Sequence, residues 1–249
     1  MRSTPRKYKM PQALSGHTIK YVFVGLLVLL LLLIVFMGGK RLQEAPPADL
    51  HIDASTLNAA EYESLQQSIS QQQVGSFFNT DLQAIRDRAL RLSWVDEVSV
   101  TRDWQQGIVI SVLPKKAVAH FGTERLIDAK GKVFVPADGR ELANTNYATL
   151  QGETDKGPVI MQEMQQINEW YEPLDMHVAD IILTPRMTWV VRFDNGLRVI
   201  VDNESTAQKL IALRDALNHQ LKDRRADIQS VDLRYKNGFA ITWHTTAAS

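Results

Sequence analysis

Residues 93–121 read SWVDEVSVTRDWQQGIVISVLPKKAVAHF and carry the clearest structural signal in the chain. A polar turn at Asp103–Gly107 is flanked by apolar side chains at every second position: Val98, Val100, Ile108, Ile110 and Val112. A period of two is typical of a strand with one buried face. We therefore expect two antiparallel strands joined by this turn.

The residues upstream predict a strand and two helices. Residues 50–54 alternate as a strand does, and a Gln-rich segment over 58–74 places Leu65 and Ile69 on one helical face. A second helix follows Thr80, with apolar residues at spacings of three and four: Leu82, Ile85, Ala89 and Leu92. The expected order over residues 50–112 is strand, helix, helix, strand, strand.

After Phe121 the sequence predicts a second region rich in strands. Residues 126–134 suit two short strands around a turn, 144–157 read as a loop, and Asp-Asn-Gly at 194–196 is a strong hairpin signal. Helices are expected from Pro158 and over 205–221, and further strands over 178–183, 188–193, 197–201, 228–235 and 239–243. This order predicts an α+β fold with a mixed, mainly antiparallel sheet.

A run without polar residues, YVFVGLLVLLLLLIVFM over 21–37, lies near the amino end. Counted to Gly39, it suits a helix that crosses the roughly 30 Å hydrocarbon core of a bilayer. Basic residues precede it and acidic residues soon follow, which predicts a cytoplasmic amino end. A cleaved signal peptide is the alternative, but the run is long for one and the Ala45–Ala48 segment is a poor cleavage site. We expect an uncleaved signal anchor.

Composition narrows the possible functions. The chain has 28 basic and 28 acidic residues, so no net charge favours nucleic acid as a partner. It has no cysteine, which excludes disulfides, Cys-ligated zinc and thiol catalysis. Its six histidines lack metal-binding spacing, and it has no nucleophile-elbow or phosphate-loop motif. We therefore expect a binding protein that is not an enzyme and has no metal and no cofactor.

Two segments resemble the FtsQ/DivIB family of bacterial cell-division proteins. The first is similar to the family's POTRA signature at Trp94, Val95, Val98, Val100, Arg102, Trp104, Ile108, Ile110, Val118 and Ala119. The second is similar to the run that closes the family's fold, at Val231, Asp232, Leu233, Arg234, Tyr235, Gly238, Ala240 and Trp243. The chain departs from the POTRA signature at Gln105, Pro114 and Ala117.

The resemblance implies five parts. These are a basic cytoplasmic tail (1–20), a transmembrane anchor (21–39), a linker (40–48), a POTRA domain (49–121) and a β domain (122–249). The family role is that of a bitopic inner-membrane scaffold at the division septum, which links assembly of the cytoplasmic ring to septal peptidoglycan synthesis. Two alternatives are a POTRA-type adaptor for secretion or envelope assembly and a membrane-anchored periplasmic enzyme.

The resemblance also implies partners. By family, the β domain binds the small bitopic proteins FtsB and FtsL, and the POTRA domain or the membrane region contacts FtsK, FtsW and FtsI. The lipid bilayer is the expected partner of residues 21–39. Self-association is a further possibility that the sequence leaves open.

The last strand is the principal candidate binding site. A terminal strand leaves one row of backbone groups open to an added strand. The candidate residues are Arg234, Tyr235, Lys236, Asn237, Gly238, Phe239, Ile241 and Trp243, together with Arg186. Arg234 and Lys236 would pair with carboxylates of the partner, and Tyr235 or Phe239 would anchor it. The alternative is a plain closing hairpin whose aromatic side chains face the core.

The POTRA strands offer a weaker candidate site. It consists of Val98, Val100, Arg102, Ile110 and Val112. Trp104, beside the predicted turn, is expected to cap the core, as a Trp in that position usually does.

Overall fold

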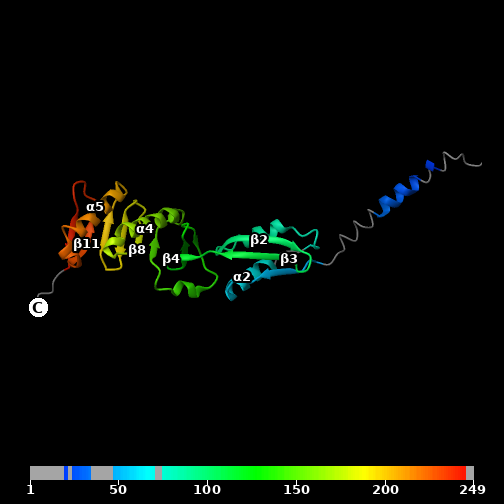
Figure 1. Cartoon of the computed structure of the whole chain (residues 1–249), viewed down its shortest axis with the longest axis horizontal. Helices are drawn as coiled ribbons and strands as arrows, with labels where there is room; N and C mark the ends of the chain where they lie inside the picture. Colours follow the sequence, from blue (N-terminus) through cyan, green and yellow to red (C-terminus); the bar gives the residue numbers. More distant parts are fainter. Residues whose placement is uncertain (1–19, 22–23, 35–46, 71–74, 245–249) are drawn as a thin grey trace, which may run out of the picture. The chain divides into compact units, whose positions relative to one another are not determined.

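The computed structural model describes residues 20–21, 24–34, 47–70 and 75–244 (Figure 1). The chain divides into two compact units. One is drawn from residues up to 51 together with 73–82 and 101–109, and the other from 52–72, 83–100 and 110 onward.

The first sheet has three strands in the order β1 (Leu50–Asp53), β3 (Gly107–Pro114) and β2 (Val95–Asp103). Between β1 and β2 come the helices α2 (Ala59–Ser70) and α3 (Leu82–Ala89). The predicted order of strand, helix, helix, strand, strand is therefore confirmed. At the start of α2, Asn58 N–H donates to the Glu61 carboxylate at 2.8 Å and Glu61 N–H donates to Asn58 Oδ1 at 2.9 Å, a reciprocal cap that fixes where the helix begins.

The second sheet has nine strands in the order β12-β11-β10-β9-β8-β7-β4-β5-β6. The strands are β4 (Ala117–Phe121), β5 (Arg125–Asp128), β6 (Val133–Phe134), β7 (Thr149–Gln151), β8 (Val178–Leu183), β9 (Trp189–Phe193), β10 (Arg198–Val201), β11 (Ile228–Asp232) and β12 (Ala240–Trp243). Three of its pairings, β4 with β7, β7 with β8 and β10 with β11, are parallel, and the others are antiparallel. The predicted mixed, mainly antiparallel sheet is confirmed.

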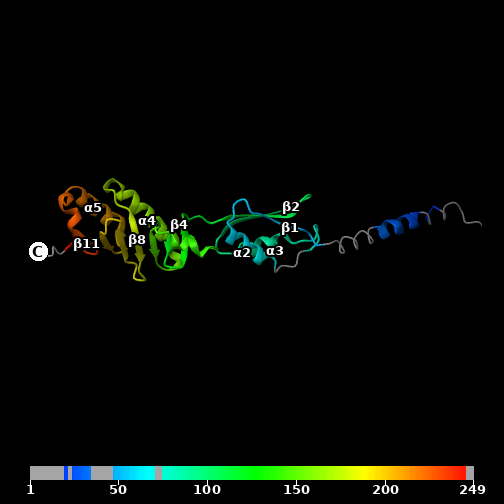
Figure 2. The ribbon, with the colours of Figure 1, turned by 90° about the horizontal axis from the view of Figure 1, so that it is seen from below.

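One face of this sheet is covered by α4 (Gly157–Tyr171) and α5 (Thr206–Asn218), as Figure 2 shows. Short 3-10 turns complete the chain: η1 (Gly139–Ala143), η2 (Thr154–Lys156), η3 (Glu172–Leu174) and η4 (Lys222–Asp227). Tyr171 lies in the core at 0% exposure, stacks on Phe193 at 4.7 Å, and donates its hydroxyl to the Leu210 carbonyl at 2.8 Å. Burial raises the pKa of the Tyr171 phenol, so this hydroxyl remains a donor that joins α4 to α5.

Two features of the second sheet differ from the sequence analysis. The prediction of a loop over 144–157 is wrong for β7, which lies inside the sheet with Leu150 fully buried. Only Leu150 of β7 is buried, so the strand has no period that sequence could reveal. The short strand β4 was not foreseen, because it follows directly on the stretch that suggested the first sheet. The predicted domain boundary after Phe121 stays a prediction.

The predicted tail, anchor and linker lie largely outside the described residues. Residues 24–34 are helical. Within the part of the chain that the structure describes, no helix has the length and apolar character needed to cross a bilayer.

A substitution at Gly131 tests the close approach of the β5–β6 turn to α4. It has φ +80°, and an added Cβ would stand 2.6 Å from Pro158 N at the start of the helix. We expect Gly131→Ala to lower the free energy of unfolding by about 2–4 kcal/mol, because backbone strain adds to overpacking. Gly196→Ala, at φ +89° with open space around it, should cost only about 1–2 kcal/mol. Urea denaturation measures both, and equal losses would show that the close approach has no energetic weight.

Candidate partner-binding surface

The strand β12 forms one edge of the nine-stranded sheet. It pairs with β11 on one side, with Val231 opposite Ile241 and Asp232 opposite Ala240, and no described strand lies on its other side. The predicted edge position is therefore confirmed. His244 N–H donates inward to the Asp227 carbonyl at 2.8 Å. Since backbone groups alternate in direction along a strand, the amides of Ile241 and Trp243 face outward, toward the open edge.

The apolar side chains around β12 fall into two groups. Ile241 and Trp243 are half-buried against the hydrophobic core, and the Arg224 guanidinium lies 3.9 Å from the centre of the Trp243 ring. Tyr235 is 58% exposed and Phe239, just before the strand begins, is 37% exposed. The first group fixes the strand to the sheet. The second group is free to contact another molecule.

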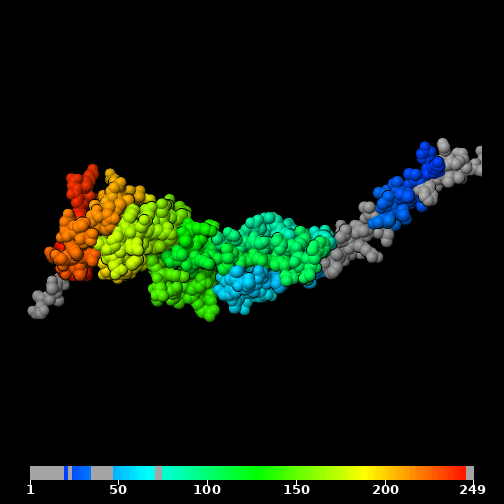
Figure 3. Space-filling view, in the orientation of Figure 1, coloured from blue at the N-terminus to red at the C-terminus, as the bar shows by residue number. Residues whose placement is uncertain are grey.

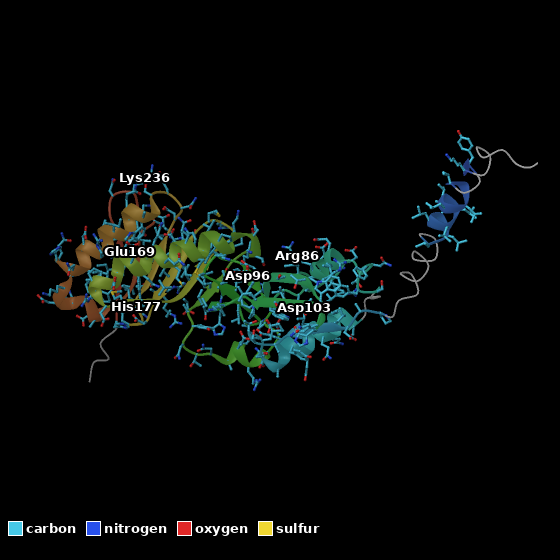
Figure 4. All side chains as sticks on the ribbon, turned by 45° about the vertical axis from the view of Figure 1, so that its right-hand side comes forward. Arg86, Asp96, Asp103, Glu169, His177 and Lys236 are labelled. Carbon is cyan, nitrogen blue, oxygen red and sulfur yellow. The ribbon has the colours of Figure 1, made fainter. Side chains whose placement is uncertain are left out.

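The loop between β11 and β12 projects from the surface (Figure 3, red). Residues 235–240 line an open hollow of about 470 Å³. Lys236 lies on this loop and is labelled in Figure 4. An exposed loop with aromatic side chains and a hollow, next to a strand whose outer edge has no described partner, combines two features that peptide-binding surfaces use.

Arg234 is already engaged within the chain. Its Nε lies 3.0 Å from Asp232 Oδ1 and its Nη2 lies 2.7 Å from Asp232 Oδ2, a two-pronged ion pair. The hydrogen bonds from Arg234 lower the pKa of the Asp232 carboxyl, and the same carboxylate raises the pKa of Arg234. A partner carboxylate must therefore compete with Asp232 for this guanidinium. We did not foresee this competition from the sequence.

Lys236 and Arg186 are different, because neither side chain has an ion-pair or hydrogen-bond partner among the described residues. Arg186 lies in the turn between β8 and β9. Trp189 at the start of β9 pairs with Val201 at the end of β10, and β10 runs parallel to β11. The β8–β9 turn and the loop after β11 thus lie at the same end of the sheet, about two strand spacings or 10 Å apart. The structure brings the two free cations to one end of the sheet.

The weaker candidate site in the first sheet is mostly interior. Three of its five side chains, those of Val98, Ile110 and Val112, are buried. Val100 is half-buried and Arg102 is exposed, but the Arg102 guanidinium donates to three backbone carbonyls of the chain itself. What this region can offer a partner is the backbone of β2, which lies at a sheet edge.

No group of three or more His, Asp or Glu side chains in the described residues is arranged to hold a metal ion. Glu163 on α4 has a raised pKa because of burial, and its Oε1 has no hydrogen-bond partner. One carboxyl by itself does not form a metal site or an acid–base pair.

The chain is similar to known proteins along nearly its whole folded length. A family model described as "POTRA domain, FtsQ-type" matches residues 51–113, and one described as "Cell division protein FtsQ/DivIB, C-terminal" matches 117–234. Cell division protein FtsQ of Acinetobacter oleivorans is 35% identical over 204 residues, which cover 82% of this chain and 71% of the relative. Cell division protein FtsQ of Aliivibrio fischeri is 29% identical over 174 residues, which cover 70% of this chain and 67% of the relative.

These matches define a class of protein in which an FtsQ-type POTRA domain is followed by the C-terminal region of FtsQ/DivIB division proteins. The chain belongs to the FtsQ/DivIB family of cell division proteins. The resemblance noted from its sequence is thereby confirmed.

The exposed position of Tyr235 and the buried position of Leu233 can be tested by measuring the stability of two variants. We expect Tyr235→Ala to change the free energy of unfolding by no more than about 0.5 kcal/mol, because the ring is 58% exposed. Leu233→Ala, two residues earlier at 2% exposure, should cost about 2–5 kcal/mol. Thermal unfolding of both variants is the measurement. A large loss for Tyr235→Ala would place its ring in the core and remove it from the binding surface.

Proposed function

We propose that this protein is a membrane-anchored scaffold of the cell-division machinery, which binds its partners by adding a strand to β12. Family membership supports the role in division. The observation that carries the binding mechanism is the unpaired edge of β12, flanked by exposed Tyr235 and Phe239.

The mechanism is equilibrium binding without a chemical reaction. A partner segment in extended conformation hydrogen-bonds to the outward backbone groups of Ile241 and Trp243. Tyr235 and Phe239 supply aromatic anchors, which typically carry most of the affinity at such surfaces. Lys236 and Arg186 attract acidic side chains of the partner and bias the direction in which the segment docks. Together these features specify a partner that is extended, apolar on one face and acidic at one end.

The proposed partners follow the family. FtsB and FtsL occupy the β12 edge, and FtsK, FtsW and FtsI contact the first sheet or the membrane region. In this proposal residues 21–39 anchor the chain in the inner membrane at the division site, with the tail in the cytoplasm and both folded domains in the periplasm. The chain then connects the cytoplasmic division ring with septal peptidoglycan synthesis.

Binding of the periplasmic segment of FtsB by the full chain in detergent tests this proposal. Tyr235→Ala should weaken binding by at least about thirtyfold, which corresponds to the roughly 2 kcal/mol of an anchor residue. Trp104→Ala is the matched control, because it removes an aromatic ring that is more exposed than that of Tyr235 and lies far from β12 in sequence, and it should leave binding unchanged. Equal effects of both variants, or no binding by the unaltered chain, would contradict the proposal.

Ile241→Pro tests the strand-addition mechanism separately. Proline removes the amide that faces the open edge and leaves the inward hydrogen bonds to β11 intact. We expect a folded protein, as judged by its circular dichroism spectrum, that no longer binds the FtsB segment. Undiminished binding by this variant would show that the partner docks through side chains and does not extend the sheet.

A further inference from the structure

Three aromatic side chains form an exposed cluster at the tip of the first sheet. Trp104 is 82% exposed and Phe78 is 56% exposed. The Trp104 ring centre lies 5.0 Å from that of Phe77 and 5.9 Å from that of Phe78, and the two Phe rings are 5.2 Å apart, edge to face. The expectation that Trp104 caps the core is therefore wrong. Its ring packs on two neighbouring rings and presents the rest of its surface outward.

The loops that carry the cluster are held in place by hydrogen bonds between side chains and backbone groups. The Arg102 guanidinium donates to the carbonyls of Phe77 at 2.7 Å, Phe78 at 3.3 Å and Thr80 at 2.8 Å. The Thr80 hydroxyl in turn lies 2.9 Å from the Gly75 carbonyl. Asp103, labelled in Figure 4, accepts hydrogen bonds from the backbone of Gln105 and Gln106 and so shapes the turn that carries Trp104. Exposed aromatic rings on a fixed loop lose little conformational entropy when they bind.

The same loops form backbone contacts with residues 47–49, which precede β1. Ala48 N–H donates to the Gly75 carbonyl at 2.9 Å, and Pro47 forms a bridge with Ser76, next to Phe77. The carbonyl of Asp49 accepts from Ile108 N–H at 2.9 Å, just after the Trp104 turn. Residues 47–49 are therefore tied to the two segments that carry the aromatic rings.

Chain length limits how far these rings can lie from the apolar run. Residues 38–46 separate Met37, at the end of the run, from Pro47. Nine residues span at most about 30 Å even when fully extended. If 21–37 crosses a bilayer, the cluster is confined to a zone close to the membrane surface.

We propose that Phe77, Phe78 and Trp104 insert into the interface of the bilayer and dock the first sheet against the membrane. The inference rests on the anchor in the proposed function. Aromatic side chains, and Trp above all, favour the boundary between lipid headgroups and acyl chains. Asp49, Asp81 and Asp103 lie in the same segments, and the Arg102 guanidinium donates to backbone carbonyls of the chain itself, so attraction to anionic headgroups does not drive the contact. The occupant is thus a neutral, zwitterionic lipid interface.

The tryptophans provide a direct test. All five, Trp94, Trp104, Trp170, Trp189 and Trp243, lie outside the apolar run, so the anchor itself contributes no tryptophan signal. The full chain is placed in nanodiscs of phosphatidylcholine, with and without bromine on the acyl chains near the headgroup. Bromine quenches a tryptophan only on close approach. We expect brominated lipid to reduce the emission of the unaltered chain, and Trp104→Leu to abolish that reduction.

Control variants and outcomes separate this inference from the proposed function. Trp170→Leu, on α4, should leave the quenching intact, and thermal unfolding should confirm that both variants fold. If the chain enters the nanodiscs but Trp104 is not quenched, docking is overturned and the anchored scaffold stands. If the chain does not enter them, the anchor fails and docking fails with it. Quenching that appears only after anionic phosphatidylglycerol is added would overturn the neutral interface.

Discussion

One face of the nine-stranded sheet must be buried, and this constraint determines where the helices pack and how the strands are aligned with one another. The helices α4 and α5 cover that face, and Tyr171 joins them through its hydrogen bond to Leu210. Because side chains alternate between faces along a strand, burying one face fixes the register of each strand against the next. That register extends through β11 to β12, which pairs with β11 alone among the described strands. The exposed edge is thus a consequence of how the core is filled.

The edge is stable without a second partner strand because its inner half is fixed. Ile241 and Trp243 pack on the core, and Arg224 lies over the Trp243 ring. An exposed edge of this kind is an aggregation hazard unless something covers it. Here a loop with two cations lies beside it: Lys236 has no ion-pair partner among the described residues, and Arg234 is paired with Asp232. In the account proposed above, a partner segment with acidic side chains covers the edge.

Much of this could be predicted from sequence, and what could not be has physical causes. The alternation of Ile108, Ile110 and Val112 predicted one strand, and the turn at 194–196 predicted the two strands beside it. Both predictions succeeded because each signal lies within a short stretch of sequence. The strand β7 has a single buried residue, Leu150, and pairs only with distant strands, so no local pattern could reveal it. The contact of Arg224 with the Trp243 ring depends on tertiary structure, and the Asp232–Arg234 ion pair, although local, follows from no repeating pattern. Likewise, alternation placed Val98 and Ile110 on a regular face, but could not tell a binding face from a buried one.

Residue-resolved amide hydrogen exchange would test the central claim most directly. In the free protein, the amides of Ala240 and Thr242 should exchange slowly because they bond to β11, and those of Ile241 and Trp243 should exchange fast because they face the open edge. Addition of the periplasmic segment of FtsB should slow exchange at Ile241 and Trp243. If the segment binds and these two amides still exchange at their original rates, β12 is not extended by an added strand and the account is contradicted.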